Sequence, residues 1–282
     1  MTQKFPSLIV SLLTLGALPL CLQAQTTTTT TTAALAPAAA TAPVVAAPAA
    51  PTSSWTFTPS VVSQYMFRGV RLGGLSFEPA IEFDYDNIGL GVWMNFPLAN
   101  KVDGVSDPEI DPYGYYTIAI NDSFSVVPGF TWYTYPRADS SVGFYKATFE
   151  PNVAFNYTVG GVKFTPKFYY DLFLEGPTYE LTVAWALPLK NLGTELHFTG
   201  TIGTYKWKKA AENTYPDVHN YGDYWLLGVS APYAINSSSK IIVGFAYTQG
   251  NNNFYHQTGS PKVENTTAVG RGVVTVSYAI TF

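Results

Sequence analysis

Residues 75–86 read Leu-Ser-Phe-Glu-Pro-Ala-Ile-Glu-Phe-Asp-Tyr-Asp. Successive side chains of an extended chain point to opposite sides, so this pattern predicts a strand with one apolar and one polar face. The polar face would carry Ser76, Glu78, Glu82 and Asp84. The same alternation recurs along the chain, and no helical pattern is available to cover the apolar faces. Apolar faces without a protein partner are typical of a barrel that turns them to lipid.

We therefore predict an all-β fold, a transmembrane antiparallel up-and-down β-barrel of twelve strands, with ten and fourteen strands as alternatives. A tilted strand needs about 9–11 residues to cross a bilayer, and most of the segments are that long or longer. The predicted strands are 55–69, 75–86, 88–97, 109–120, 123–135, 142–157, 162–174, 178–188, 195–206, 223–234, 240–249 and 267–282. The lipid face would include Val92, Met94, Ile118, Ile120, Val126, Phe130, Phe149, Val153, Leu181, Val183, Leu227, Val229, Val243, Phe245, Val274 and Val276.

The links between these segments alternate in length. Asn, Asp and Gly predict tight turns at 86–87, 121–122, 159–161, 190–194 and 236–239. The intervening links, 70–74, 98–108, 136–141, 175–177, 207–222 and 250–266, include the longest ones. Outer-membrane barrels combine short periplasmic turns with longer external loops and an even strand number. Twelve strands with both barrel ends in the periplasm satisfy every link.

Aromatic residues gather at the predicted strand ends, where they would form interfacial girdles. They are Trp55, Phe57, Tyr65, Phe67, Tyr85, Phe96, Trp132, Tyr157, Tyr170, Tyr179, Tyr233 and Tyr247. Prolines disagree with the pattern, because proline cannot donate to a ladder and a closed barrel has no edge strand. Pro59, Pro79, Pro112, Pro128, Pro151, Pro166 and Pro232 must lie at bulges, or the predicted boundaries are wrong.

The N-terminal part of the chain differs from the rest. Residues 1–24 carry a lysine, an apolar stretch and a small residue at the end, which predicts a cleaved signal peptide. Residues 25–54 are rich in Thr, Ala and Pro and predict a disordered periplasmic spacer, with cell-wall contact as an alternative. Residues 55–282 would form the barrel. The one cysteine, Cys21, lies in the signal segment, so the mature chain would lack disulfides, cysteine metal sites and a thiol nucleophile.

Composition agrees with a membrane barrel. Charged residues make up 12% of the chain and aromatic residues 16%, against about 25% charged in soluble domains. The net charge of −4 argues against a nucleic-acid partner, which would need a basic surface. No cofactor is expected, and the sequence indicates no oligomeric state.

Side chains alternate between the two faces of a strand, and this alternation puts fifteen charged residues on the faces that point into the lumen. Charge on the lipid face would be costly. The acids are Glu78, Glu82, Asp84, Glu109, Asp111, Glu150, Asp171, Glu175, Glu180 and Glu195. The bases are Arg68, Lys146, Lys163, Lys167 and Arg271. They predict either a water-filled pore or a set of ion pairs that plugs a narrow barrel.

Several large aromatic residues also occupy inward-pointing positions of the predicted strands. They are Trp93, Tyr113, Tyr115, Tyr133, Tyr169, Phe173 and Tyr205. They either stack against sugars or nucleosides in the lumen or simply fill space.

Three smaller patterns occur in the sequence. Asp103, Asp107, Glu109 and Asp111 form an acidic run that could bind calcium, although a solvated loop is the expected interpretation, and no metal site is predicted. The run Lys206, Lys208 and Lys209 could contact lipopolysaccharide phosphates.

A lipid-modifying enzyme would need a lipid-facing His and Ser. His219 and His256 fall in loops, and His197 points inward with Thr199, not a serine, two positions away, so no enzyme is predicted.

The chain ends on an alternating strand with a terminal aromatic residue, Phe282. That ending is similar to the signal read by the outer-membrane barrel assembly machinery, which is therefore an expected partner.

Residues 64–70, Gln-Tyr-Met-Phe-Arg-Gly-Val, followed by Gly73-Gly74 and by 77–80, resemble the opening of the TorF-like putative porins. Members of that family begin with Tyr-x-Phe-Arg-Gly and continue through strands ending in Gly-x-Trp, which Gly91-Val92-Trp93 matches. The resemblance covers about 50 residues and implies an outer-membrane pore of undefined substrate.

The sequence thus predicts an outer-membrane porin-like channel for passive diffusion of small hydrophilic solutes, weakly preferring cations. An envelope-anchoring barrel without an open pore is the alternative, and a lipid-modifying barrel enzyme comes third. Membrane lipid, lipopolysaccharide and small solutes are the other expected partners.

Overall fold

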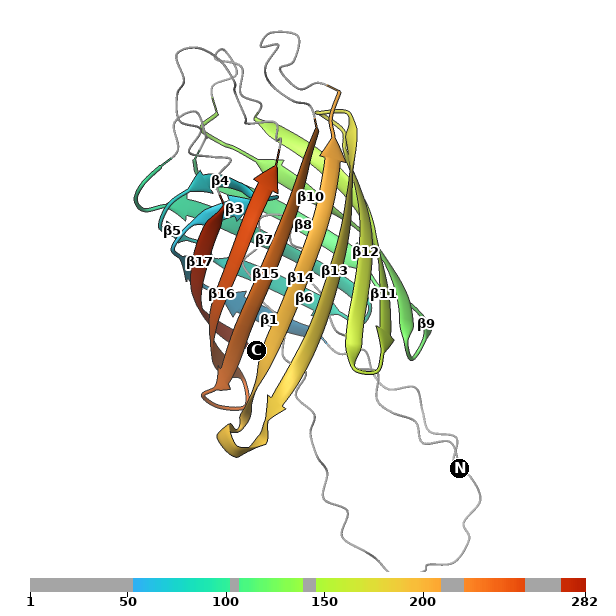
Figure 1. The fold of residues 1–282 in the computed structure, drawn as a ribbon, viewed down its shortest axis with the longest axis vertical. Helices are drawn as coiled ribbons and strands as arrows, with labels where there is room; N and C mark the ends of the chain where they lie inside the picture. The colour runs from blue at the N-terminus through green and yellow to red at the C-terminus, as the bar shows by residue number, and fades with distance from the viewer. Residues whose placement is uncertain (1–52, 102–106, 139–145, 209–220, 252–269) are drawn as a thin grey trace, which may run out of the picture.

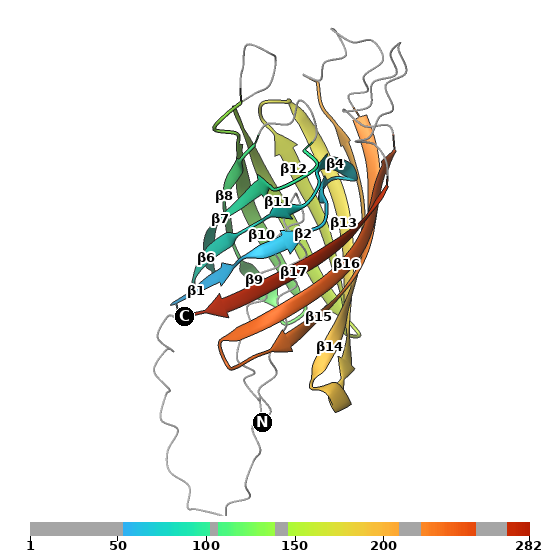
Figure 2. The same cartoon turned by 90° about the vertical axis from the view of Figure 1, so that its left-hand side faces the viewer.

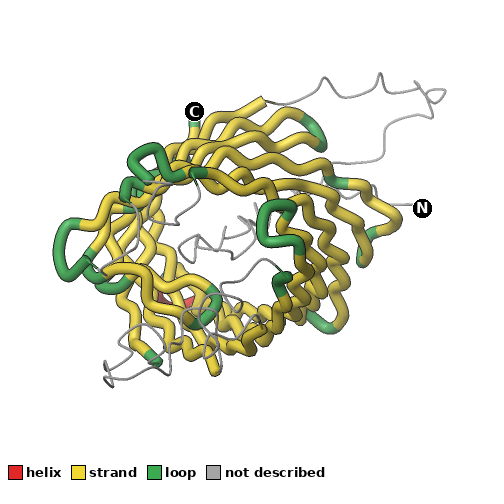
Figure 3. The backbone as a smooth tube through the Cα atoms, turned by 90° about the horizontal axis from the view of Figure 1, so that it is seen from above, coloured by secondary structure: helices red, strands yellow, loops and turns green. Residues whose placement is uncertain are grey.

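The structure is a computed structural model that describes residues 53–101, 107–138, 146–208, 221–251 and 270–282. They form a closed antiparallel barrel of twelve strands, seen along its length in Figure 1 and from above in Figure 3. Closure comes from the first strand, which pairs with the last through Thr56–Thr281 and Phe57–Ile280. Within the described residues no helix is long and apolar enough to span a membrane.

Three of the twelve barrel strands are interrupted. The first consists of β1 (Ser53–Thr58) and β2 (Ser60–Val62), the second of β5 (Ser76–Phe77) and β6 (Ala80–Tyr85), and the fourth of β8 (Glu109–Tyr116) and β9 (Ile118–Asn121). The others are β7 (Ile88–Pro97), β10 (Phe124–Thr134), β11 (Ala147–Val159), β12 (Val162–Asp171), β13 (Gly176–Leu189), β14 (Thr194–Lys206), β15 (Tyr221–Ala234), β16 (Ser239–Asn251) and β17 (Arg271–Thr281). A 3₁₀ turn, η2 (Lys190–Leu192), joins β13 to β14.

The tight turns all lie at one end of the barrel, which we call the turn end. The start of β1 and the end of β17 lie there too, and the longer links lie at the opposite loop end (Figure 2). Residues 1–52 lie outside the described part, so the signal peptide and the spacer remain predictions. The described residues also exclude most of the links 207–222 and 250–266 and the predicted strand starts at 142 and 267.

One predicted strand is wrong in a consequential way. The barrel strand predicted over 55–69 ends at Val62, and the following residues form a separate small hairpin, β3 (Tyr65–Phe67) and β4 (Val70–Gly73). Alternation continued past Val62 in the sequence, but it belongs to a hairpin that has no ladder bond to the barrel sheet.

The prolines are accommodated in two ways. Pro59 and Pro79 lie at the interruptions β1/β2 and β5/β6, where their carbonyls still accept bonds from Tyr278 N and Met94 N at 3.0 Å. The remaining five lie within strands, paired in register with neighbours. Proline therefore interrupts two strands and is tolerated in β8, β10, β11, β12 and β15.

The two faces of the sheet have the expected chemistry. Along β14, for example, the outward Phe198 and Ile202, 37% and 60% exposed, alternate with the buried Thr199 and Thr201. Most of the predicted girdle residues are exposed near strand ends. Two predicted girdle residues are not on the lipid face: Tyr65 is 2% exposed and Phe67 is partly buried, because both belong to the hairpin.

Candidate functional site: an inward hairpin and its polar seat

The β3–β4 hairpin is turned by Arg68 and Gly69, whose φ angles are +47° and +76°. Two left-handed central residues are typical of a type I′ turn, which matches the twist of the flanking strands. Glycine is needed at the second position for a further reason, since a Cβ on Gly69 would lie 2.3 Å from the backbone nitrogen of Gly250. Arginine at the first position is strained, because side chains disfavour this region.

The hairpin leaves the wall between β2 and β5 and contacts β7, β8, β11 and β16. Val70, Leu72 and Tyr65 pack with Trp93 of β7 and Tyr113 of β8 in one buried apolar cluster. At the tip, Gly250 N of β16 donates to Gly69 O at 2.9 Å. The apolar side of the hairpin thus rests on β7 and β8, and its tip reaches β16, which β17 separates from β2.

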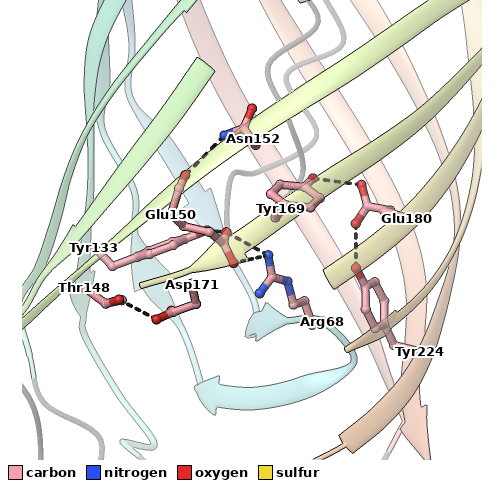
Figure 4. A network of polar contacts seen from close by, with 9 residues as sticks. All are labelled: Arg68, Tyr133, Thr148, Glu150, Asn152, Tyr169, Asp171, Glu180 and Tyr224. Carbon is pink, nitrogen blue, oxygen red and sulfur yellow. Dashed lines mark hydrogen bonds and ion pairs between the residues drawn. The ribbon is translucent and has the colours of Figure 1, made fainter. Parts of the chain in front are cut away.

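Arg68 makes the principal contact of the tip (Figure 4). Its Nη2 donates to both oxygens of Glu150 of β11, at 2.9 and 2.8 Å, and Tyr133 OH donates to the same carboxylate at 3.0 Å. The guanidinium carbon lies 4.7 Å from the Phe67 ring centroid and 5.0 Å from that of Tyr169. Glu150 is fully buried, and removing one partner of a buried ion pair commonly costs about 3–5 kcal/mol.

A second carboxylate lies beside this pair. Glu180 of β13 accepts from Tyr169 OH at 3.2 Å and from Tyr224 OH at 2.7 Å (Figure 4). Lys167 Nζ lies 4.5 Å from the centroid of the Tyr169 ring, near enough to Glu180 and Glu150 for their charges to act on it. Among the described residues, the buried Lys167 Nζ and Arg68 Nε have no hydrogen-bond partner.

Arg71 lies on the opposite, partly exposed side of the hairpin. Its Nε donates to Gln64 at 2.6 Å and its Nη2 to the carbonyl of Asn100 at 2.9 Å. Partial burial and the neighbouring charge of Arg271 lower the pKa of the Arg71 guanidinium. Arg71 thus lies within electrostatic range of the like charge of Arg271.

A repeated motif organises the carboxylates of the wall, with an acid, a glycine and a tyrosine directly opposite one another on three adjacent strands. Glu82, Gly91 and Tyr113 are aligned in this way, and Tyr113 OH donates to Glu82 at 2.8 Å. A Cβ on Gly91 would lie 2.3 Å from the tyrosine ring, so only glycine lets the ring cross the middle strand.

The motif occurs twice more. Asp84, Gly89 and Tyr115 repeat it beside the first copy, with a hydroxyl-to-carboxylate distance of 2.8 Å. Glu180, Gly203 and Tyr224 repeat it on β13, β14 and β15. Sequence reasoning missed the motif, because the three residues are brought together by sheet register and share no sequence spacing.

The predicted lumen charges take three kinds of position. The buried ones are Arg68, Glu78, Glu82, Glu109, Asp111, Glu150, Lys167, Asp171 and Glu180. Partly buried are Asp84, Lys163, Glu175, Glu195 and Arg271. Lys146 differs from the expectation, since its side chain is exposed at a bend before β11 begins.

The predicted lumen aromatics are engaged in contacts within the chain. Tyr113, Tyr115, Tyr133 and Tyr169 each donate a hydroxyl to a carboxylate, as described above. Trp93 is fully buried against Tyr65, and Tyr205 stacks on Trp207 with centroids 4.1 Å apart. Phe173, at 44% exposure, does not point into the lumen core. These contacts favour the space-filling interpretation over a free stacking surface.

The structure describes some residues of the acidic run, the lysine run and the histidines that the sequence analysis singled out. Asp107 pairs with Lys101, whereas Glu109 and Asp111 are buried, and no group of three metal-binding side chains occurs among the described residues. Asp103, Lys209, His219 and His256 lie outside the described residues. Lys206 and Lys208 are exposed.

His197 points inward and is buried, with its Nε2 2.7 Å from Glu195 Oε1. The register also places Ser230 of β15 opposite His197, a serine that sequence spacing did not reveal. The hydroxyl of Ser230 has no hydrogen-bond partner in the described part of the chain, so a nucleophile–base contact is not formed.

Together these contacts can narrow a lumen. Eight-strand barrels are filled by their own side chains and sixteen-strand barrels leave an open channel, so twelve strands leave an intermediate space. Here the hairpin and its seat of buried tyrosines and carboxylates occupy part of that space at the loop end.

The chain belongs to the family described as "Bacterial protein of unknown function (Gcw_chp)", which matches residues 48–282. The more specific TorF-like resemblance remains a prediction. No curated protein matches the chain in sequence.

Solved structures share the fold. The NanC porin is 8% identical, with a TM-score of 0.51 over 80% of this chain and 98% of that one. The KdgM porin is 12% identical, with a TM-score of 0.49 over 81% and 99%. An outer membrane channel from Pseudomonas putida F1 is 11% identical, with a TM-score of 0.46 over 84% and 97%. At such identities the likeness to the NanC porin supports the barrel architecture alone.

Proposed function

We propose that this member of the Gcw_chp family is an outer-membrane channel for passive diffusion of small hydrophilic solutes, with no enzymatic activity. The observation that carries the proposal is the division of the closed sheet into an apolar outer face and an inner face of charged and hydroxyl side chains. An apolar exterior supports a position in a membrane, and a polar interior of intermediate width suits water and small solutes.

Weak cation preference belongs to the same proposal. The inner face of β5–β8 and the links between these strands carries Glu78, Glu82, Asp84, Glu109 and Asp111. The buried bases Arg68 and Lys167 lie instead beside Glu150 of β11 and Glu180 of β13. A charged lining of one sign biases the ions that a pore passes.

Single-channel recording of the refolded full chain in a planar bilayer tests the proposal. Discrete conductance steps are expected, together with swelling of liposomes in isosmotic solutions of small sugars. A folded, heat-modifiable barrel that gives neither steps nor swelling would contradict it.

A structural barrel without an open pore is the second candidate. The observation that favours it is the buried network around Arg68 and Glu150, in which tyrosines and carboxylates satisfy one another. Its expected result is a folded barrel that stays silent in the bilayer even when the hairpin is removed.

A further inference from the structure

The two sides of the β3–β4 hairpin are held by different forces. The side facing β7 and β8 packs its apolar residues against Trp93 and Tyr113, and Tyr65 OH donates to the buried Glu109 of β8 at 2.5 Å. The contacts of the tip are the backbone bond from Gly250 of β16 to Gly69 and the ion pair between Arg68 and Glu150 of β11. The hairpin thus has a largely apolar seat on β7 and β8 and polar attachments to β11 and β16.

The strand pairing of the barrel does not include the hairpin. It forms its own two-stranded sheet, and the chain rejoins the barrel ladder at Ser63, whose nitrogen donates to Val274 O at 2.9 Å, and at Leu75, which accepts from Leu98 N at 2.8 Å. Displacement of the tip between these two points breaks no strand pairing of the closed sheet.

Several features of the closed position are unfavourable. Arg68 has a left-handed backbone, and Arg71 lies near the like charge of Arg271. Lys167 Nζ and Arg68 Nε are buried without a partner among the described residues, although burial of a charged group is costly unless its donors are satisfied. Water could satisfy these donors if the tip moved away, so the closed position depends strongly on the Arg68–Glu150 pair.

We propose that the β3–β4 hairpin is a gate in the lumen, latched shut by the ion pair between Arg68 and Glu150, and that loss of this pair releases the tip and widens the passage. The inference rests on the proposed channel function. It adds a closed and an open position and identifies the contact that decides between them.

Single-channel recording compares wild type with Arg68→Gln, Glu150→Gln and a variant in which 64–74 is replaced by a short Gly-Ser linker. The deletion should conduct most. The two single variants should show higher mean conductance than wild type, with transitions toward the level of the deletion. Arg137→Gln removes an exposed arginine outside the hairpin and should behave as wild type.

The charge-exchanged double variant Arg68→Glu/Glu150→Arg tests the pair itself. It should return conductance toward the wild-type level, because the ion pair is restored with its polarity reversed. If a single variant yields no heat-modifiable barrel, Arg68→Lys takes its place. Lysine keeps the charge but loses the guanidinium hydrogen bonds to both oxygens of Glu150.

The rate of cleavage by trypsin measures release of the hairpin independently of conductance. Cleavage after Arg71 in the refolded barrel should be faster in Arg68→Gln and Glu150→Gln than in wild type or Arg137→Gln. Equal cleavage rates and equal conductance in all of these would overturn the latch.

The outcomes separate the two proposals. A deletion variant that conducts like wild type overturns the gate and leaves the channel intact. A larger conductance in the deletion, with single variants identical to wild type, shows a static constriction and also overturns the gate. Silence of every variant, the deletion included, overturns the channel.

Discussion

Trp55 and Phe282 exchange two backbone hydrogen bonds, from Phe282 N to Trp55 O at 2.9 Å and from Trp55 N to Phe282 O at 3.3 Å. The last residue of the chain thus closes the barrel against its first strand at the turn end. The side chain of Phe282 takes little part in this closure, because it is 75% exposed.

Replacement of Phe282 by Asp should therefore lower the amount of assembled barrel without altering the backbone pairing. The expected cause is loss of an exposed aromatic terminus that the assembly machinery recognises. The heat-modifiable fraction of the protein in membranes measures it, with Phe282→Tyr as control. Equal fractions in both variants would show that the aromatic terminus has no such role.

A charge on the outer face should destabilise the barrel according to its depth. Leu227→Arg, in the middle of β15, should cost about 2–4 kcal/mol, whereas Tyr233→Arg, near the turn end, should cost about 0–1 kcal/mol. Urea unfolding in lipid vesicles measures both. Similar costs at the two positions would contradict the assignment of the lipid face.

The acid–glycine–tyrosine motif predicts a specific glycine effect. In Gly203→Ala the new Cβ would lie 2.2 Å from the Tyr224 ring, which must leave and release Glu180. Loss of a hydrogen bond to a buried charge should reduce the free energy of unfolding by about 1.5–3 kcal/mol. Gly200→Ala on the same strand meets only Leu227 at 3.4 Å and is the matched control. Equal unfolding midpoints would show that the tyrosine is not displaced.

Ion selectivity should depend on the acidic wall. Glu82→Gln together with Asp84→Asn should lower the permeability ratio of K⁺ to Cl⁻, because both carboxylates face the lumen. The wild-type preference should also weaken at high salt, as the Debye length falls from about 10 Å at 0.1 M to about 3 Å at 1 M. Reversal potentials in a salt gradient measure the ratio, and Asp86→Asn in an exposed turn is the control. A ratio unaffected by the double substitution would remove the basis for cation preference.

Membrane orientation can be tested with single cysteines, because Cys21 is the only natural one and lies in the predicted signal peptide. If the tight turns are periplasmic, an impermeant maleimide added to intact cells should label Lys208→Cys at the loop end. It should not label Ser238→Cys at the turn end until the outer membrane is permeabilised. The reverse labelling pattern would show that the barrel has the opposite orientation in the membrane.

The architecture of this protein could be predicted from the sequence by itself. Period-two alternation in segments such as 75–86 determines which side chains face lipid, and tight-turn residues such as Asn121-Asp122 separate one strand from the next. Both are local properties of an extended chain, so an antiparallel barrel of about twelve strands, with ten and fourteen left open, and its inward and outward faces follow without knowledge of the fold.

Only the tertiary structure decided what fills the barrel. The Tyr-x-Phe-Arg-Gly segment alternates like a strand, and the sequence does not distinguish a wall strand from a hairpin folded into the lumen. That choice depends on partners far away in the chain, Glu109 for Tyr65, Glu150 for Arg68 and Gly250 for Gly69. The acid–glycine–tyrosine motif has the same origin, because residues such as Glu82, Gly91 and Tyr113 become neighbours only when strand register aligns them. Register is a relation between strands, and it appears only once the sheet has closed.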